Sequence, residues 1–207
     1  MTRVKICGLN DHEGFAAAVD AGADYVAFNF FAKSPRFVSP DQAAKISARH
    51  AGGPLRVALL VQPDDALLWD VVSGLGPDIL QLYDNPERVA EIQARTGIPV
   101  WRAVGVSTAA DLPVSTDGAA ALLIEAKPPK DATCPGGNAT AFDWGVLRGW
   151  KPDFDWMLAG GLTPENVAAA IRITGAPAVD VSSGVESSPG VKDPDRIRAF
   201  IRAARGG

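Results

Sequence analysis

Short apolar runs alternate with longer amphipathic stretches along the whole chain of 207 residues. This alternation is typical of repeated βα units around a parallel sheet whose strands are buried on both faces. The pattern predicts eight strands, whose number and order favour a closed barrel. The predicted strands are Val4 to Cys7, Tyr25 to Phe30, Arg56 to Val61, Ile79 to Leu82, Val100 to Val104, Ala121 to Glu125, Trp156 to Ala159 and Val179 to Val181.

Four predicted helix starts share one design, in which an N-cap residue precedes a proline and then an acid. They are Ser39-Pro40-Asp41, Asn85-Pro86-Glu87, Thr163-Pro164-Glu165 and Asp193-Pro194-Asp195. Glycines stand where helices should end, at positions 22, 97 and 175. We therefore expect an α/β fold, a single (β/α)8 TIM barrel of near-minimal length that forms one domain over residues 1–207.

Composition excludes several classes of partner. Hydrophobic residues make up 47% and charged residues 21% of the chain, and the net charge is −4, so nothing indicates binding to nucleic acid or to an anionic membrane. No apolar stretch approaches the roughly 18 residues of a membrane helix, and no secretory segment precedes the first strand, so we expect a cytoplasmic protein. Cys7 and Cys134 lie far apart without metal-ligand spacing, which predicts free thiols and no metal site.

Two consecutive strand–loop–helix units between Phe154 and Glu186 predict a phosphate site. Gly160 and Gly161 follow one strand, and the segment after them opens a helix expected over Asn166 to Ile173. Ser182, Ser183 and Gly184 follow the next strand. Uncovered backbone N–H groups and hydroxyls can approach an anion, and (β/α)8 barrels often bind phosphate after strands seven and eight. A pair of ordinary tight turns is the alternative.

Acid–base chemistry is predicted at the carboxyl ends of the strands, where the active sites of such barrels lie. Cys7 ends the first strand and could act as a base if its pKa were lowered toward neutrality, although a small buried hydrophobe is the commoner role. Glu125 ends the sixth strand, where burial would favour a protonated acid. Alternatively, Glu125 could pair with Lys127 in a salt bridge at the barrel rim.

Three further residues are candidates for substrate binding. Arg36 lies in a loop after the second strand, where its planar fork could hold a carboxylate. Gln81 lies on the fourth strand, and Asp180 on the eighth could bind sugar hydroxyls or cap the following turn. The Pro/Gly-rich segment Lys127 to Asn138 is either an active-site loop or a surface insertion. His12 and His50 fall in or beside predicted helices and are expected to be surface residues.

Several motifs together resemble phosphoribosylanthranilate isomerase over essentially the whole chain. They are Lys5-Ile6-Cys7-Gly8-Leu9, Gly22-Ala23-Asp24-Tyr25-Val26, Ser34-Pro35-Arg36-Phe37-Val38, Gly136-Gly137, Phe142-Asp143-Trp144, Leu158-Ala159-Gly160-Gly161-Leu162 and Asp180-Val181-Ser182-Ser183-Gly184-Val185-Glu186.

The resemblance implies an Amadori rearrangement of N-(5-phosphoribosyl)anthranilate to 1-(2-carboxyphenylamino)-1-deoxyribulose 5-phosphate, without metal or organic cofactor. Cys7 would be the general base, Glu125 the general acid, and Arg36 would hold the anthranilate carboxylate. We expect this small molecule to be the partner and a monomer to be favoured over a homodimer.

The chain departs from the family pattern at several positions. Glu125 stands in place of the usual Asp, Tyr83-Asp84 in place of His-Gly, Ala27 in place of Gly, and Ala139-Thr140 in place of Gly-Lys or Gly-Arg.

Two alternatives stay open at this point. One is a phosphosugar-binding barrel that has lost or changed catalysis and is not an enzyme. The other is an isomerase of the histidine-pathway type, which resembles this barrel but typically uses two aspartates and binds two phosphates. Against the second, strand one ends in Cys7, and the loop Gln62-Pro63-Asp64-Asp65 lacks a Gly-Gly pair.

Overall fold

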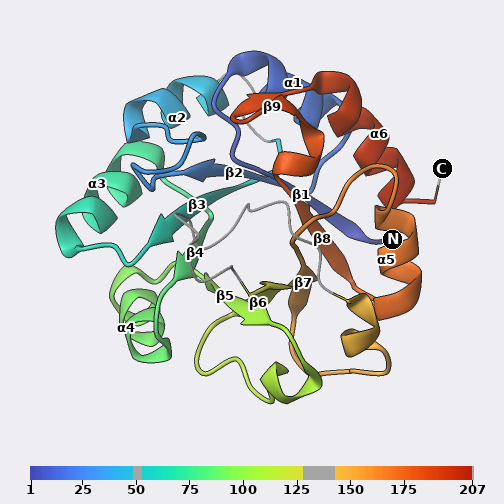
Figure 1. Cartoon of the computed structure of the whole chain (residues 1–207). Helices are drawn as coiled ribbons and strands as arrows, with labels where there is room; N and C mark the ends of the chain where they lie inside the picture. Colours follow the sequence, from blue (N-terminus) through green and yellow to red (C-terminus); the bar gives the residue numbers. More distant parts are fainter. Residues whose placement is uncertain (49–52, 128–142, 207) are drawn as a thin grey trace.

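Eight parallel strands close into a barrel in which β1 pairs with both β2 and β8 (Figure 1). The structure is a computed structural model that describes residues 1–48, 53–127 and 143–206. All eight predicted strands and their order are confirmed, with ends that differ by one or two residues. The strands are β1 (Arg3–Cys7), β2 (Tyr25–Asn29), β3 (Leu55–Val61), β4 (Ile79–Tyr83), β5 (Val100–Val106), β6 (Ala121–Ala126), β7 (Trp156–Leu158) and β8 (Ala178–Val181).

Helices surround the barrel on its outside (Figure 1). They are α1 (His12–Asp20), α2 (Pro40–Ser47), α3 (Asp65–Leu75), α4 (Pro86–Thr96), α5 (Val167–Thr174) and α6 (Pro194–Ala204). The regular βα repeat changes after β5, which is followed by the short 3-10 helix η2 (Ala109–Asp111). The described residues between β6 and β7 contain another, η3 (Trp144–Leu147). The expected active-site loop begins at Lys127, and its remaining residues lie outside the described part.

Three of the four predicted helix starts are confirmed. Helices α2, α4 and α6 begin at their prolines, and the side chains of Ser39, Asn85 and Asp193 accept hydrogen bonds from their first turns. The prediction for α5 is wrong by one residue, because Thr163 to Asn166 form a separate turn before Val167. In that turn the Asn166 amide accepts from the backbone N of Thr163 at 2.8 Å and donates to the carbonyl of Gly161 at 2.9 Å.

Alternate residues of each strand pack into two different layers. The outer layer lies between strands and helices and includes Ile6, Phe28 and Phe200. The inner layer fills the barrel itself and includes Cys7 and Met157. Residues two apart on a strand therefore share the barrel interior, which determines which polar side chains can meet.

A small antiparallel hairpin, β9 (Glu186–Ser188) and β10 (Val191–Lys192), follows the 3-10 helix η4 (Ser183–Val185). The carbonyl of Gly190 in this hairpin accepts from the Asn10 side chain at 2.9 Å. A Cβ added at Gly190 would lie 2.5 Å from the carbonyl oxygen of Pro35. The hairpin thus packs against the loops after β1 and β2. Among the described helices, none is long and apolar enough to cross a membrane.

Candidate active site

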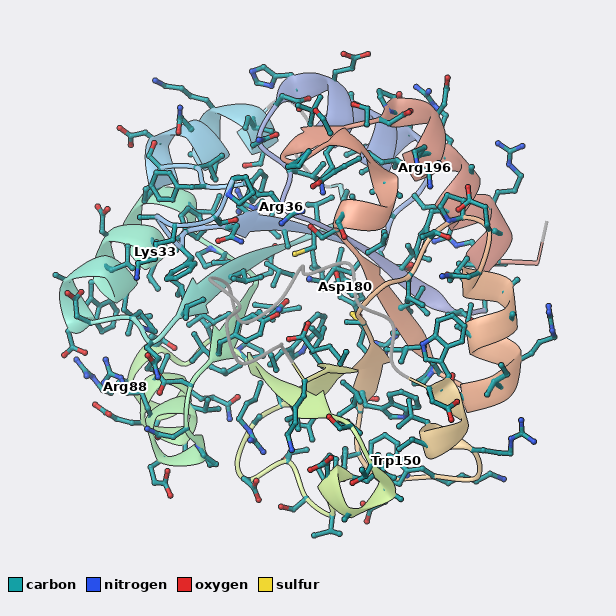
Figure 2. The ribbon with its side chains drawn as sticks, in the orientation of Figure 1. Lys33, Arg36, Arg88, Trp150, Asp180 and Arg196 are labelled. Atoms are coloured by element: carbon teal, nitrogen blue, oxygen red, sulfur yellow. The ribbon has the colours of Figure 1, made fainter. Side chains whose placement is uncertain are left out.

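Polar side chains from four separate strands share the barrel interior. Cys7 on β1, Gln81 on β4, Glu125 on β6 and Asp180 on β8 are all buried. Figure 2 places Asp180 near the centre of the barrel, where the strands converge. Glu125 and Cys7 both lie within electrostatic reach of Asp180. The four residues that the sequence indicated at different strands therefore form one buried cluster.

A buried ion pair lies at the base of this cluster. The Lys5 ammonium donates to Asp180 Oδ1 at 2.7 Å, and the Lys5 side chain is completely shielded from water. Burial alone lowers the pKa of Lys5, but the Asp180 carboxylate outweighs it, so the net direction is upward and Lys5 stays charged. The Asp180 carboxylate is thus already paired with a lysine of the neighbouring strand β1.

Sequence reasoning did not assign a role to Lys5. A signal was present, because Lys5 lies two residues before Cys7 on a strand and must share its face. A lysine inside a strand buried on both sides requires an anionic partner.

Burial raises the pKa of the Cys7 thiol above its ordinary value, which corrects the expectation of a lowered pKa. Cys7 is 5% exposed, and the cost of holding a thiolate there exceeds the stabilisation from Lys5 and Lys192. The nearby Asp180 carboxylate also raises the pKa. Cys7 is therefore a thiol at neutral pH in the ligand-free protein.

Glu125 is an acid that remains protonated at neutral pH. Burial raises its pKa from 4.5 to about 8, partly offset by interaction with the Tyr83 hydroxyl, while the Asp180 carboxylate raises it further. The alternative pairing with Lys127 is wrong, because Lys127 Nζ instead contacts Asp111 Oδ1 at 2.7 Å. The expectation of a raised carboxyl pKa at the end of β6 is confirmed.

The Gln81 side chain is fully buried, and both its amide nitrogen and its amide oxygen lack a hydrogen-bond partner in the described part of the protein. Burying an amide in this state costs about 1–3 kcal/mol for each unsatisfied group. Such groups are uncommon in folded proteins and call for a partner. A polar ligand inside the barrel would supply one.

Arg36 reaches toward the same end of the barrel from the loop after β2 (Figure 2). Its backbone N donates to Ser34 Oγ at 3.1 Å, and Asn29 donates to the same hydroxyl at 3.2 Å. The side chain crosses over Gly8, where an added Cβ would lie 2.6 Å from Arg36 Cδ. The guanidinium makes two hydrogen bonds to Glu186, so one edge of the fork is already used inside the protein.

The loops after β7 and β8 pack directly against each other. Gly160 and Gly161 both have positive φ, of 85° and 65°. At Gly184 an added Cβ would lie 1.8 Å from the carbonyl oxygen of Leu162, so only glycine permits this approach. Among the described residues, no hydrogen bond uses the backbone N–H of Gly161, Ser183 or Gly184. The five residues predicted to bind phosphate therefore lie in two adjoining loops, in which these three backbone N–H groups could donate to an anion.

The site defines a class of enzyme. A protonated carboxylic acid, a thiol and a lysine–aspartate pair inside a barrel, beside two glycine-containing loops, suit proton transfer on a phosphorylated substrate. No group of three or more metal-binding side chains occurs within residues 1–48, 53–127 and 143–206. These features are those of an acid–base isomerase on a (β/α)8 barrel.

Comparisons with known proteins identify the family. The model of the N-(5'phosphoribosyl)anthranilate (PRA) isomerase family matches residues 4–203. The N-(5'-phosphoribosyl)anthranilate isomerase of Paracoccus denitrificans is 59% identical over 206 residues, covering 97% of this chain and 96% of the relative. The phosphoribosyl anthranilate isomerase structure from Thermotoga maritima is 37% identical with a TM-score of 0.85, covering 100% of both chains.

A further solved phosphoribosyl anthranilate isomerase is in complex with reduced 1-(o-carboxyphenylamino)-1-deoxyribulose 5-phosphate. It is 36% identical with a TM-score of 0.83, again over 100% of both chains. The chain belongs to the N-(5'-phosphoribosyl)anthranilate isomerase family and is an isomerase of tryptophan biosynthesis. The non-enzyme and histidine-pathway alternatives are thereby set aside.

Proposed function

We propose that this chain catalyses the Amadori rearrangement of N-(5'-phosphoribosyl)anthranilate with Glu125 as the general acid and Cys7 as the general base. The observation that carries the proposal is the burial of Glu125 inside the barrel beside Tyr83, which raises the pKa of this carboxyl to about 8 and keeps it protonated at neutral pH. An acid in that state can give a proton to the furanose ring oxygen. The ring C–O bond then breaks, the nitrogen lone pair forms the C=N bond, and Glu125 becomes a carboxylate.

Cys7 removes the C2 proton in the second step. The iminium formed by ring opening acidifies this proton, and its positive charge also favours a neighbouring thiolate over a thiol. Cys7 first releases its thiol proton to water, and the thiolate then takes the C2 proton while the C–H electron pair becomes the C1=C2 bond of an enolamine. Loss of the C2 hydroxyl proton and protonation of C1 then give the ketone product, and the protein returns to its starting state. The C2 hydroxyl proton returns to the Glu125 carboxylate and Cys7 delivers its proton to C1, and the proton that the thiol first released to water is taken back when the product leaves.

The two ends of the substrate are assigned to opposite parts of the site. Arg36 would hold the anthranilate carboxylate by charge-assisted hydrogen bonds, and the loops after β7 and β8 would hold the phosphate. The unsatisfied amide of Gln81 and the Lys5-bound carboxylate of Asp180 are buried in the barrel and would contact the ribose hydroxyls or the bridging nitrogen.

Purified protein tests the proposal directly. Incubation with N-(5-phosphoribosyl)anthranilate should convert it to the deoxyribulose product, and the gene should restore growth without tryptophan to a strain that lacks the isomerase. Glu125→Gln and Cys7→Ser should each lose both activities while remaining folded. Turnover at the wild-type level in either variant would remove that residue from the mechanism.

Three expectations about the protein as a whole stay predictions. They are a single domain over residues 1–207, a monomer in solution and a cytoplasmic location. Light scattering of the purified protein measures the second, and limited proteolysis tests the first, since one domain should be degraded without a stable fragment. Fractionation of cells that produce the protein tests the third.

A further inference from the structure

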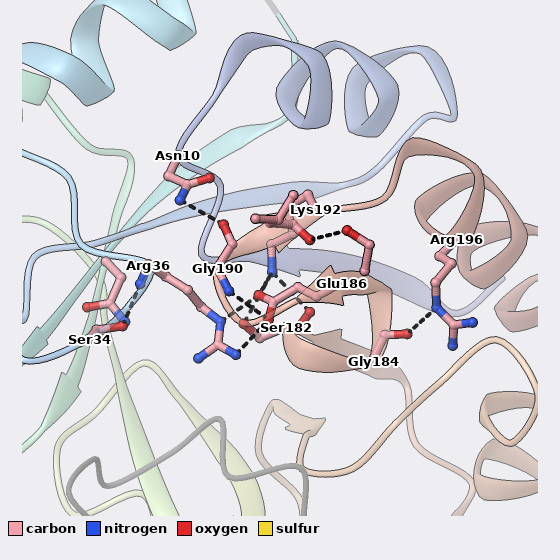
Figure 3. Close-up of polar contacts among 12 residues, drawn as sticks. Asn10, Ser34, Arg36, Ser182, Gly184, Glu186, Gly190, Lys192 and Arg196 are labelled. Carbon is pink, nitrogen blue, oxygen red and sulfur yellow. Dashed lines mark hydrogen bonds and ion pairs between the residues drawn. The ribbon is translucent and has the colours of Figure 1, made fainter.

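A chain of buried polar contacts connects Arg36 to the loop after β8 through the β9–β10 hairpin (Figure 3). The first link is a bidentate pair, in which Arg36 Nε donates to Glu186 Oε1 at 2.6 Å and Nη2 donates to Oε2 at 2.9 Å. Both side chains are almost fully shielded, with 10% and 4% exposed. A fork-to-carboxylate contact of this kind fixes the plane of the guanidinium as well as its position.

The second link holds Glu186 in place. Lys192 Nζ donates to Glu186 Oε1 at 2.7 Å, and the backbone N of Gly190 donates to Oε2 at 3.2 Å. The same ammonium donates to the carbonyl of Ser182 at 2.9 Å, and its distance to Ser182 Oγ is 3.4 Å. The Lys192 side chain has no exposed surface. One buried lysine therefore contacts both the carboxylate that holds Arg36 and the loop proposed to hold phosphate.

An arginine without this support would occupy many rotamers, and holding it in one orientation costs conformational entropy at the moment of binding. Here Gly8 lies beneath the Arg36 side chain and Glu186 fixes one edge of its fork. The orientation is thus determined before any ligand arrives. Two cations sharing one carboxylate also leave this trio with a formal excess of positive charge, which favours an incoming anion.

We propose that Glu186 and Lys192 are positioning residues that orient the Arg36 guanidinium and so set the preference for a substrate with an aromatic carboxylate. Through Lys192, the same hairpin keeps the carboxylate end of the site in register with Ser182 at the phosphate end. The inference rests on the proposed role of Arg36. Neither Glu186 nor Lys192 is required to touch the reacting atoms.

The test compares two ligands by calorimetry at one fixed pH. One is reduced 1-(o-carboxyphenylamino)-1-deoxyribulose 5-phosphate, and the other is the same compound without its carboxyl group. Glu186→Gln keeps the shape of the side chain but removes its charge, and it should lower the ratio of the two affinities on the order of tenfold or more. Affinity for the ligand without the carboxyl group should stay unchanged. Glu91→Gln is the matched control, because Glu91 pairs with Arg95 at 2.8 Å on the surface of α4.

A double variant separates positioning from general support of the fold. If Glu186 acts through Arg36, adding Glu186→Gln to Arg36→Lys should cause little further fall in the ratio of the two affinities. If the two residues act independently, the effects of the two substitutions on the free energy of binding should add. Should Glu186→Gln not fold, Glu186→Asp keeps the charge, withdraws the carboxylate by about 1.5 Å and must show the same fall.

Two results for Glu186→Gln would overturn the positioning role: an equal loss of affinity for both ligands, or an unchanged ratio of the two affinities where Arg36→Lys lowers that ratio. Either result would leave the proposed function unaffected. If Arg36→Lys itself left the ratio unchanged, the assignment of Arg36 would fail and the positioning role with it.

Discussion

Replacing Glu125 with Gln should abolish turnover and at the same time stabilise the folded protein near neutral pH. Glu125 is 6% exposed, and its carboxyl has a pKa of about 8, against an ordinary value of 4.5. The folded protein therefore holds this proton more tightly than the unfolded chain does. The resulting stability is fully present below pH 4.5 and is lost as the pH rises through about 8.

The size of the effect follows from the difference between the two pKa values. At pH 7 the unfolded chain has released this proton while most of the folded protein keeps it, which lowers the free energy of unfolding by about 3 kcal/mol at about 1.36 kcal/mol per pH unit. The loss approaches about 5 kcal/mol above pH 8. Glutamine keeps the shape and cannot ionise, so Glu125→Gln should recover this energy at pH 7 and none of it at pH 4.

Urea unfolding of wild type and Glu125→Gln at pH 4.5, 6, 7 and 8 measures this difference, and kcat measured on the same preparations shows whether turnover is lost. A difference in stability that did not grow with pH would mean that Glu125 is not a buried neutral acid. Wild-type turnover in the glutamine variant would remove it from the mechanism, and Asp180 would be the next candidate acid.

Glu125→Asp shows whether the site depends on the longer side chain. Aspartate withdraws the carboxyl by about 1.5 Å, and a misplacement of about 1 Å can cost on the order of 100-fold in rate. We expect kcat to fall, while an increase would identify the glutamate as a weakened form of the family site.

Three further predictions concern the base and the two ends of the substrate. Because Glu125 must be protonated and Cys7 ionised, kcat/KM should rise about tenfold per pH unit up to about pH 8, and a profile already flat between pH 6 and 8 would show a preformed thiolate. Arg36→Lys should raise KM roughly tenfold because a point charge cannot replace a fork, and unchanged kinetics would make Arg36 a structural residue. Sulfate soaked into crystals should bind between Gly161 and Ser183, and finding it only elsewhere would contradict the phosphate assignment.

The strands could be predicted from the sequence because each is buried on both faces and therefore forms an apolar run. Positions of the site residues along the barrel followed from the same pattern, since Cys7 ends β1 and Glu125 is the last but one residue of β6. Their ionisation could only partly be predicted. Burial was foreseen for Glu125, whereas the thiol of Cys7 proved too deeply buried for Lys5 to lower its pKa below the ordinary value.

The side-chain contacts between residues far apart in the chain could not be predicted from the sequence. Lys5 meets Asp180 across a separation of 175 residues, and Arg36 meets Glu186 across 150. Nothing local distinguishes Glu186 from an exposed hairpin residue, because its partners come from the loop after β2 and from β10. Barrel closure, in which β1 pairs with β8, is what brings such residues together.

Glu125 stands where the family resemblance leads us to expect aspartate, and it lies beside a second departure from that pattern, Tyr83. Tyr83 on β4 and Glu125 on β6 are separated by β5, whose inward positions between them are Ala103 and Gly105 by register with Trp101. Neither residue places a large side chain between the two, and a Cβ added at Gly105 would lie 3.1 Å from Lys127 Cγ. Tyr83 in turn interacts with the Glu125 carboxyl and limits the rise in its pKa. The two departures from the expected family pattern are therefore coupled, because the longer acid and the tyrosine interact with each other inside the barrel.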